Sequence, residues 1–416
     1  MSDTTLKKTC VINPATDRAV KADGKIGKRL LETRRLKKEG KVAPAAKPKL
    51  KTETPPAKPA AKKAKPAEPA KPAPKKAEPL PNIKDTDDTP FINEPTTATG
   101  KYNLPNRVKF INNVKELVKN IKNGDCVEPR KFGNNDGYTV RNIINLEQKI
   151  GTESAYGVIY LTKIAGASDN YKIASKLFKD IAGNKNEIKL MDYLTTNVIL
   201  KQKSRHFLAL YNKSVCKDKE LNDKLRLLSI NELAHGDLKG LVEDKNVMAK
   251  DEQVINMFIQ VMISIATFQK ATSMRHADCH FGNILYQKNN EKGFYHYKCD
   301  GKDYYLPTSD YNMMLYDFGL AKKYKKDTSG GKALILDYYR IIHAFINRTD
   351  GGWCEGFVNK ATSKKMNDVK KDLLKYINND PDSIPDNIIE LINTSFPNVF
   401  TKLRPPNVIN AIPFEI

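Results

Sequence analysis

Two carboxylates and one amide within residues 275–319 restrict the fold of this chain more than any other part of its sequence. Asp278 lies in the run RHADCHFGNIL, Asn283 follows it by five residues, and Asp317 follows the strand-like residues 313–316. A carboxylate can accept a proton from an attacking hydroxyl, and an amide with a second carboxylate can bind Mg²⁺ on the phosphates of a nucleotide. We therefore expect a fold that brings these three side chains to one site.

The runs HADCHFGN and DFGLA, the latter beginning at Asp317, resemble the catalytic loop and the D-F-G segment of the protein kinase superfamily. The loop alone is a weak signal, but the two segments together are specific. The resemblance implies an α+β, bilobal protein-kinase-like fold across residues 101–416, with a small β-rich N-lobe at about 130–235 and a larger helical C-lobe at about 236–416. It also implies ATP and Mg²⁺ as cofactors, with Asp278 as the proton acceptor and Asn283 and Asp317 as metal ligands.

Earlier in the chain, residues 171–178 alternate as expected for a strand, and Lys176 should project from it. There Ile173-Ala174-Ser175-Lys176 matches the kinase V-A-x-K signature. A charge on a half-buried strand needs a partner, and Glu187 offers one from a segment with helical apolar spacing. The resemblance implies that Lys176 and Glu187 form the ion pair that orients the nucleotide phosphates.

A turn is expected between strands at residues 143–150 and 158–164. In kinases a glycine-rich hairpin at this position covers the phosphates, but this turn keeps only two glycines. The resemblance nevertheless implies a nucleotide-binding hairpin made of Gly151, Thr152, Glu153, Ser154, Ala155, Tyr156, Gly157, Val158 and Ile159. An ordinary β-hairpin remains the alternative.

A second run, His235-Gly236-Asp237-Leu238-Lys239, imitates a catalytic loop. Five residues after Asp237, where a catalytic loop needs a metal-binding asparagine, this run has Val242. No long helix precedes the run. We therefore expect a hinge between the lobes, with Asp237 capping a short helix and adenine bonding to the backbone of residues 232–234. An amphipathic helix at residues 251–274 should deliver the true catalytic loop.

The remaining catalytic segment should contain five further features. An amphipathic helix is expected at residues 106–121, an inserted hairpin at 286–312 and a mobile activation-type segment at 322–331. A buried helix is expected at residues 337–346, with His343 packed in the core. Two or three short helices should follow after residue 361.

Positive charge is concentrated at the N-terminus of this chain of 416 residues, whose net charge is +23. Residues 1–80 hold 22 Lys and Arg against 8 Asp and Glu, a net charge of +14. This arm either binds a polyanion, such as nucleic acid, acidic protein or a membrane surface, or only keeps the protein in solution. Residues 41–100 should form a disordered Ala/Lys/Pro-rich linker. Within residues 1–40, the segment 10–31 resembles the two-cysteine adaptor of large DNA viruses (iridovirus-like), although its second cysteine is missing.

Six widely separated cysteines, with no C-x-x-C pair, lead us to expect neither a disulfide framework nor a zinc ribbon, and a reducing compartment. A zinc site at His276, Cys279 and His280 is the weak alternative, since we expect His276 to brace the loop and Cys279 to be buried. No secretory signal is visible, and the longest apolar stretch, residues 258–268, is too short to span a bilayer. We expect a soluble intracellular protein, in the host cytoplasm or the virion if it is viral.

These features predict a serine/threonine protein kinase that acts on protein substrates. His280 stands where such kinases usually carry a lysine, and the form H-x-D-x-H also resembles aminoglycoside and choline phosphotransferases. A small-molecule phosphotransferase therefore stays open as the alternative, as does an inactive scaffold that acts through its basic arm.

Overall fold

The computed structural model describes residues 10–13, 18–21, 104–154, 157–167, 172–179, 182–218, 224–241, 244–347, 358–376 and 380–416. The chain divides into two compact units, Met1–Pro79 and Leu80–Ile416. In the first unit, strands β1 (Cys10–Asn13) and β2 (Arg18–Lys21) form an antiparallel pair. The linker predicted at residues 41–100 lies outside the described residues.

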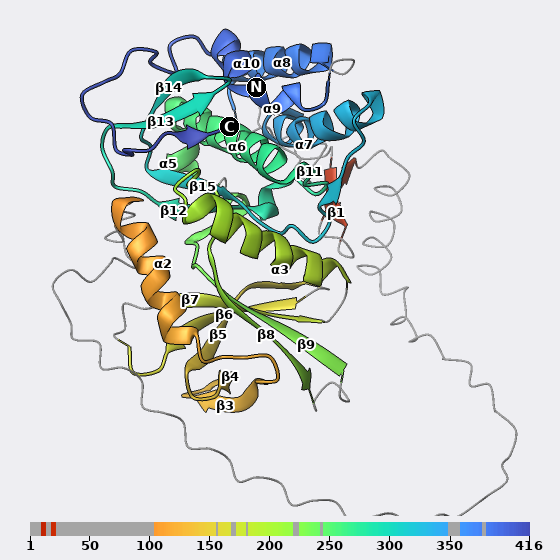
Figure 1. Cartoon of the computed structure of the whole chain (residues 1–416). Helices are drawn as coiled ribbons and strands as arrows, with labels where there is room; N and C mark the ends of the chain where they lie inside the picture. The colour runs from red at the N-terminus through yellow and green to blue at the C-terminus, as the bar shows by residue number, and fades with distance from the viewer. Residues whose placement is uncertain are drawn as a thin grey trace, which may run out of the picture. The chain divides into compact units, whose positions relative to one another are not determined.

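The second unit combines helices with one large antiparallel sheet, as the α+β class predicts (Figure 1). Seven strands pair in the order β3-β4-β5-β6-β7-β9-β8. Their bounds are β3 (Glu128–Phe132), β4 (Asn135–Val140), β5 (Ile144–Ser154), β6 (Gly157–Ile164), β7 (Lys172–Lys179), β8 (Leu210–Asp218) and β9 (Lys224–Asn231).

The predicted strands at residues 143–150, 158–164 and 171–178 correspond to β5, β6 and β7, whereas the hairpin of β3 and β4 was not predicted. The missed strand β3 reads Glu-Pro-Arg-Lys-Phe and is exposed along most of its length, so it shows no buried face to a sequence pattern. Its turn to β4 contains Gly133 at a φ of +57°, a conformation that glycine adopts without steric cost. The sheet therefore begins with an extra exposed hairpin.

Helix α2 (Leu104–Val118) confirms the amphipathic helix predicted there. Its buried residues Ile111, Val114 and Leu117 recur at helical spacing and join the core, and the helix packs on β8. Further helices are α3 (Ala182–Leu194), α4 (Leu238–Leu241), α5 (Lys245–Met248), α6 (Asp251–Thr272), α7 (Thr328–Asn347), α8 (Lys360–Lys375), α9 (Ser383–Asp386) and α10 (Ile388–Ser395). Figure 1 shows α3 between the large sheet and the helices α6 to α10.

Helix α6 is buried on nearly all sides, whereas its apolar spacing had predicted one buried face. Fifteen of its residues are buried, among them the polar Gln260 and Gln269. Among the described residues, it is the one helix with the length and hydropathy to cross a membrane, and 83% of its most apolar window is buried inside the protein. A helix that is buried on all sides carries apolar residues on every face, which explains the high hydropathy of α6.

Three small sheets complete the second unit. One joins β10 (Gly236–Asp237), β12 (Ile284–Lys288) and β15 (Tyr311–Leu315), and a second joins β11 (Met274–Arg275) to β16 (Lys322–Lys323). The third joins β13 (Phe294–Cys299), β14 (Lys302–Pro307) and β17 (Phe414–Glu415), which confirms the predicted inserted hairpin. Its tyrosines Tyr295 and Tyr297 are fully buried, so the hairpin contributes to the core.

The segment predicted to be mobile, residues 322–331, is largely ordered. Strand β16 occupies its start, and helix α7 already begins at Thr328. A Cβ atom on Gly330 would lie 1.6 Å from the carbonyl oxygen of Lys325, so this glycine permits a close backbone approach. His343 on α7 is half-buried as a residue, but both of its ring nitrogens are buried and the ring packs against Tyr339, with centroids 4.3 Å apart.

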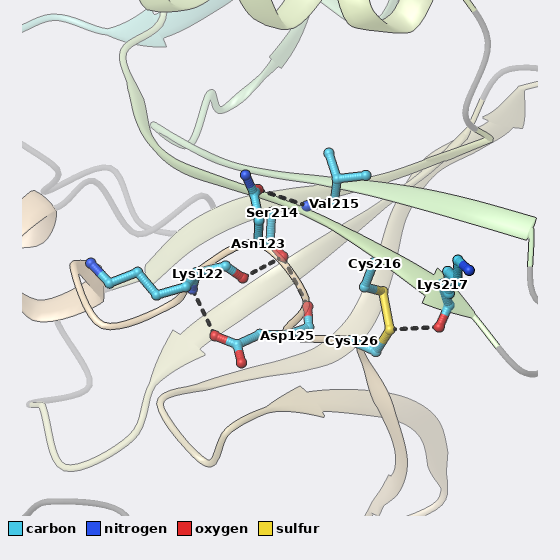
Figure 2. Close-up of a disulfide and its surroundings, with 8 residues drawn as sticks. All are labelled: Lys122, Asn123, Asp125, Cys126, Ser214, Val215, Cys216 and Lys217. Atoms are coloured by element: carbon cyan, nitrogen blue, oxygen red, sulfur yellow. Dashed lines mark hydrogen bonds between the residues drawn. A yellow bond between two sulfur atoms is a disulfide. The ribbon is translucent and has the colours of Figure 1, made fainter.

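A disulfide joins Cys126 to Cys216, contrary to the expectation of no disulfide (Figure 2). Cys126 precedes edge strand β3 and Cys216 lies in β8 at the opposite edge, so the bond requires a curled sheet. The segment before Cys126 is held to β8 as well, because the Ser214 hydroxyl lies 2.9 Å from two of its carbonyl oxygens. The spacing of the cysteines could not predict this bond, because it carries no information on which edges of the sheet come together. The disulfide also removes the cysteine-based argument for a reducing compartment.

Breaking this disulfide should destabilise the second unit. It closes a loop with a sequence separation of 90 residues, and loops of this size give about 2–4 kcal/mol of unfolding free energy. Denaturant unfolding with and without reductant measures the difference. The double variant Cys126→Ser, Cys216→Ser is the control, because its stability should not respond to reductant. Equal midpoints for the oxidised and reduced protein would contradict the role.

Candidate functional site

The predicted ion pair of Lys176 and Glu187 is present and buried. Lys176 projects from β7 and its Nζ donates to both carboxylate oxygens of Glu187 on α3, at 2.9 and 3.1 Å. Lys176 is 4% exposed and Glu187 is 1% exposed. The same Nζ lies 3.9 Å from Oδ2 of Asp317, so one ammonium joins two carboxylates that are 130 residues apart in the sequence.

Burial and charge compete in this cluster. Burial lowers the pKa of Lys176, but Tyr316, Glu187 and Asp317 together outweigh it, so that pKa lies well above its usual value. Burial raises the pKa of Glu187 to about 7, against the opposing effect of Lys176. We assign the pair as ionised at neutral pH because the lysine remains charged and bonds to both glutamate oxygens.

The catalytic-loop candidates Asp278 and Asn283 contact each other. The Asn283 amide donates to the carbonyl oxygen of Asp278 at 2.9 Å and to its Oδ2 at 3.3 Å, from a 3₁₀ turn at Phe281–Asn283. Nε2 of His280 lies 3.6 Å from the same Oδ2. The amide and the imidazole therefore both face one carboxylate oxygen.

Asp317 reaches this loop through the pairing of β12 with β15. The backbone N–H of Tyr316 donates to the carbonyl oxygen of Asn283 at 2.9 Å, immediately before Asp317. Asp317 has a φ of +60°, an uncommon conformation for a residue with a side chain, and its Oδ1 accepts from the N–H of Gly319 at 3.3 Å. These contacts bring Lys176, Asp278, Asn283 and Asp317 to one site.

His276 braces the loop, as predicted. Its imidazole is fully buried, and Nε2 lies 2.9 Å from the carbonyl oxygen of Tyr316. The Phe318 ring lies against His276 and stacks on Phe268 of α6, with centroids 5.5 and 5.0 Å apart. Cys279 is buried as expected, and burial raises the pKa of its thiol.

Asp337, which sequence analysis did not identify, holds the same loop. This buried carboxylate on α7 accepts from the backbone N–H groups of His276 at 2.7 Å and Ala277 at 2.9 Å. An acidic residue inside an apolar helix pattern was the available signal, because a buried carboxylate must find donors. Asp337 therefore fixes the backbone immediately before Asp278.

The second H-x-D run has the capping role predicted for it. Oδ1 of Asp237 accepts from the N–H of Gly240 at 2.7 Å, at the start of the short helix α4. Asp237 thus bonds locally, whereas Asp278 faces Asn283 and His280.

Glu232, in the predicted hinge, is held by a residue that sequence analysis missed. Arg107 of α2 donates to both carboxylate oxygens of Glu232, at 3.0 and 2.6 Å, and both side chains are buried. The backbone N–H of Ala209 donates to the same carboxylate at 3.0 Å. Helix α2 is therefore attached to the segment between β9 and β10.

The predicted hairpin turn is shorter than expected. Strand β5 continues to Ser154, which pairs with Gly157 at the start of β6, while Ala155 and Tyr156 lie outside the described residues. A Cβ on Gly157 would lie 2.6 Å from the Leu177 carbonyl oxygen, so contact with β7 explains this glycine. Ile159 pairs directly with Lys176 across β6 and β7. Gly151, Thr152, Glu153 and Val158 also lie on these two hairpin strands.

The oxygen atoms at this site suit Mg²⁺, which prefers carboxylate, amide and phosphate oxygens. Asp317, with a side chain 37% exposed, and Asn283 would supply the protein ligands. Among the described residues, no group of three His, Cys, Asp or Glu side chains is arranged to hold a metal by itself. A zinc site at His276, Cys279 and His280 therefore has no support among the described residues. Mg²⁺ needs fewer protein ligands, because phosphates and water complete its coordination shell.

Comparison with known proteins finds no matching family model and no matching curated protein. The geometry of the described residues is therefore the basis for assigning a function.

Removal of the Lys176 side chain should reveal the cost of an unpaired buried charge. Lys176→Met leaves Glu187 without its cation and should lower the free energy of unfolding by about 3–5 kcal/mol. The double variant Lys176→Met, Glu187→Leu should recover most of that loss, because it removes both charges. Chemical denaturation of the four proteins in this cycle gives the coupling. If the losses of unfolding free energy in the two single variants simply added in the double variant, the pairing of Lys176 with Glu187 would be contradicted.

Proposed function

We propose that this protein is an ATP-dependent serine/threonine protein kinase with a bilobal kinase-like fold. One observation carries the proposal: Lys176 lies between Glu187 and Asp317, beside a loop that holds Asp278 against Asn283. Phosphoryl transfer depends on this combination of a phosphate-binding lysine, metal-binding oxygens and a proton acceptor.

Each residue has a distinct role in the proposed reaction. Lys176 orients the nucleotide phosphates, and Glu187 holds the lysine in place. Asn283 and Asp317 would hold Mg²⁺, which neutralises charge on the phosphates when it is bound. Asp278 orients the acceptor hydroxyl and accepts its proton.

The arrangement of elements supports two lobes. The large sheet with α3 would form the N-lobe, and the α6-to-α10 region with its small sheets would form the C-lobe (Figure 1). The segment between β9 and β10 would be the hinge, where Arg107 fixes Glu232. Adenine would bond to the backbone of this hinge while the phosphates extend toward Lys176.

A small-molecule phosphotransferase is the second candidate, and His280 favours it. Serine/threonine kinases usually place a lysine here, which is a permanent cation, whereas an imidazole carries no permanent charge. Nδ1 of His280 accepts from the N–H of Gly282 at 3.1 Å, which turns Nε2 toward Asp278. An acceptor smaller than a protein would reach the same carboxylate.

For the N-terminal region we propose binding to a polyanion through the net charge of +14 in residues 1–80. The adaptor-like segment 10–31 supports an origin in a large DNA virus, and a location in the host cytoplasm or the virion. A scaffold role through this arm would leave phosphoryl transfer dispensable.

Asp278→Ala should abolish transfer while nucleotide still binds. Loss of the group that orients the acceptor and takes its proton should reduce the rate by more than the ~10²–10⁴ that general base catalysis alone contributes. Transfer of labelled γ-phosphate from ATP with Mg²⁺ measures it. Asp237→Ala is the matched control, an aspartate in the other H-x-D run that should keep transfer. Equal activity of both variants would refute the assignment.

The chemical form of the labelled product separates the two acceptor classes. A mixed protein acceptor should carry label on serine and threonine, as phosphoamino-acid analysis would show. Label confined to a low-mass product, with none in protein, would favour the small-molecule enzyme.

A further inference from the structure

Both polar groups of one backbone residue, Ala277, are held by helix α7. Its N–H donates to Oδ1 of Asp337 at 2.9 Å, and its carbonyl oxygen accepts from Nη1 of Arg340 at 2.7 Å. Asp337 and Arg340 are three residues apart on the helix, so they share a face. Ala277 has a φ of +67°, which is uncommon for an alanine and consistent with a backbone held by its surroundings.

The same guanidinium lies beside the proposed proton acceptor. Nη1 of Arg340 is 4.0 Å from Oδ1 of Asp278, while His280 and Asn283 face the other oxygen, Oδ2. The Arg340 side chain is 37% exposed, so it lies at the edge of the site. Among the described residues, it is the only arginine or lysine within 4.0 Å of the Asp278 carboxylate.

The loop has no arginine of its own at this point. Protein kinase loops commonly read H-R-D, whereas this loop reads His276-Ala277-Asp278. An alanine methyl can supply neither a charge nor a hydrogen bond. Arg340 reaches the same two residues from a separate helix.

We propose that Arg340 is a positioning residue that holds Asp278 from α7 and supplies the fixed positive charge that Ala277 cannot provide. The proposal rests on the kinase function above. Arg340 contacts the loop and not the nucleotide-binding residues Lys176 and Glu187, so it acts on the acceptor side of the reaction.

The electrostatics around Asp278 are consistent with this role. Burial raises the pKa of Asp278, but the hydrogen bond and charge of His280, with the charges of His276 and Arg340, lower it below its usual value overall. Asp337, Asp317 and Asp278 all surround His276, so acidic groups also face this region.

The test compares Arg340→Met with the unchanged protein in the ATP transfer assay. We expect kcat to fall about 10–100-fold, because a displaced catalytic group costs up to about 10²-fold, with KM for ATP unchanged. Lys332→Met, which removes an exposed lysine from the same helix, should change neither quantity.

Relocation of the charge separates positioning from mere packing. The double variant Ala277→Arg, Arg340→Met should recover part of kcat. Arg340→Lys keeps a charge without the planar fork and should be intermediate; it also carries the test if Arg340→Met fails to fold. Lost stability with an unchanged kcat, or a double variant that recovers no activity, would overturn the proposal.

The outcomes also distinguish this proposal from the function on which it rests. An unchanged protein that binds nucleotide but transfers no phosphate would refute both. An active protein whose Arg340→Met variant keeps its kcat would refute only the role of Arg340.

Discussion

A buried ammonium between two carboxylates is the interaction on which the candidate site depends. Lys176 is nearly inaccessible to water, and a lone charge in that position would cost several kcal/mol. Glu187 from α3 and Asp317 from the segment after β15 share that charge. The sheet, helix α3 and the catalytic loop must therefore come together for the charge to be tolerated.

Helix α7 holds the backbone of the loop, and helix α6 packs against the aromatic residue that follows Asp317. Helix α6 provides Phe268 against Phe318, and α7 provides Asp337 and Arg340 on either side of Ala277. Bonds to backbone groups fix a loop without using the side chains that face a substrate. The Asp278 carboxylate accepts from Asn283 and lies beside His280 and Arg340.

Helix α2 and the segment after it hold the proposed hinge and the strand β8. Helix α2 inserts Arg107 into the segment between β9 and β10, and the chain that follows it is joined to β8 by the disulfide of Cys126 and Cys216. An Arg–carboxylate pair with two parallel hydrogen bonds has a defined geometry. The proposed hinge is therefore linked to the far edge of the sheet.

Local patterns in the sequence determined most of the elements and the candidate residues. Local patterns located strands β5, β6 and β7 and helices α2 and α6, because such patterns reflect residues that are close together in the sequence. The spacing of Asp278, Asn283 and Asp317, and the lysine at 176, identified the side chains that the structure brings together. Asp237 was separated from Asp278 by the residues beside it, again a local property.

Only the tertiary structure decided which distant groups meet. Three sets of contacts join residues between 60 and 125 positions apart. They are the disulfide, the pair of Arg107 with Glu232, and the hydrogen bonds of Asp337 and Arg340 to Ala277. The exposed strand β3 and the all-round burial of α6 were missed for the same reason. Spacing along a chain records neighbours within one element, whereas burial and long-range pairing depend on how whole elements pack.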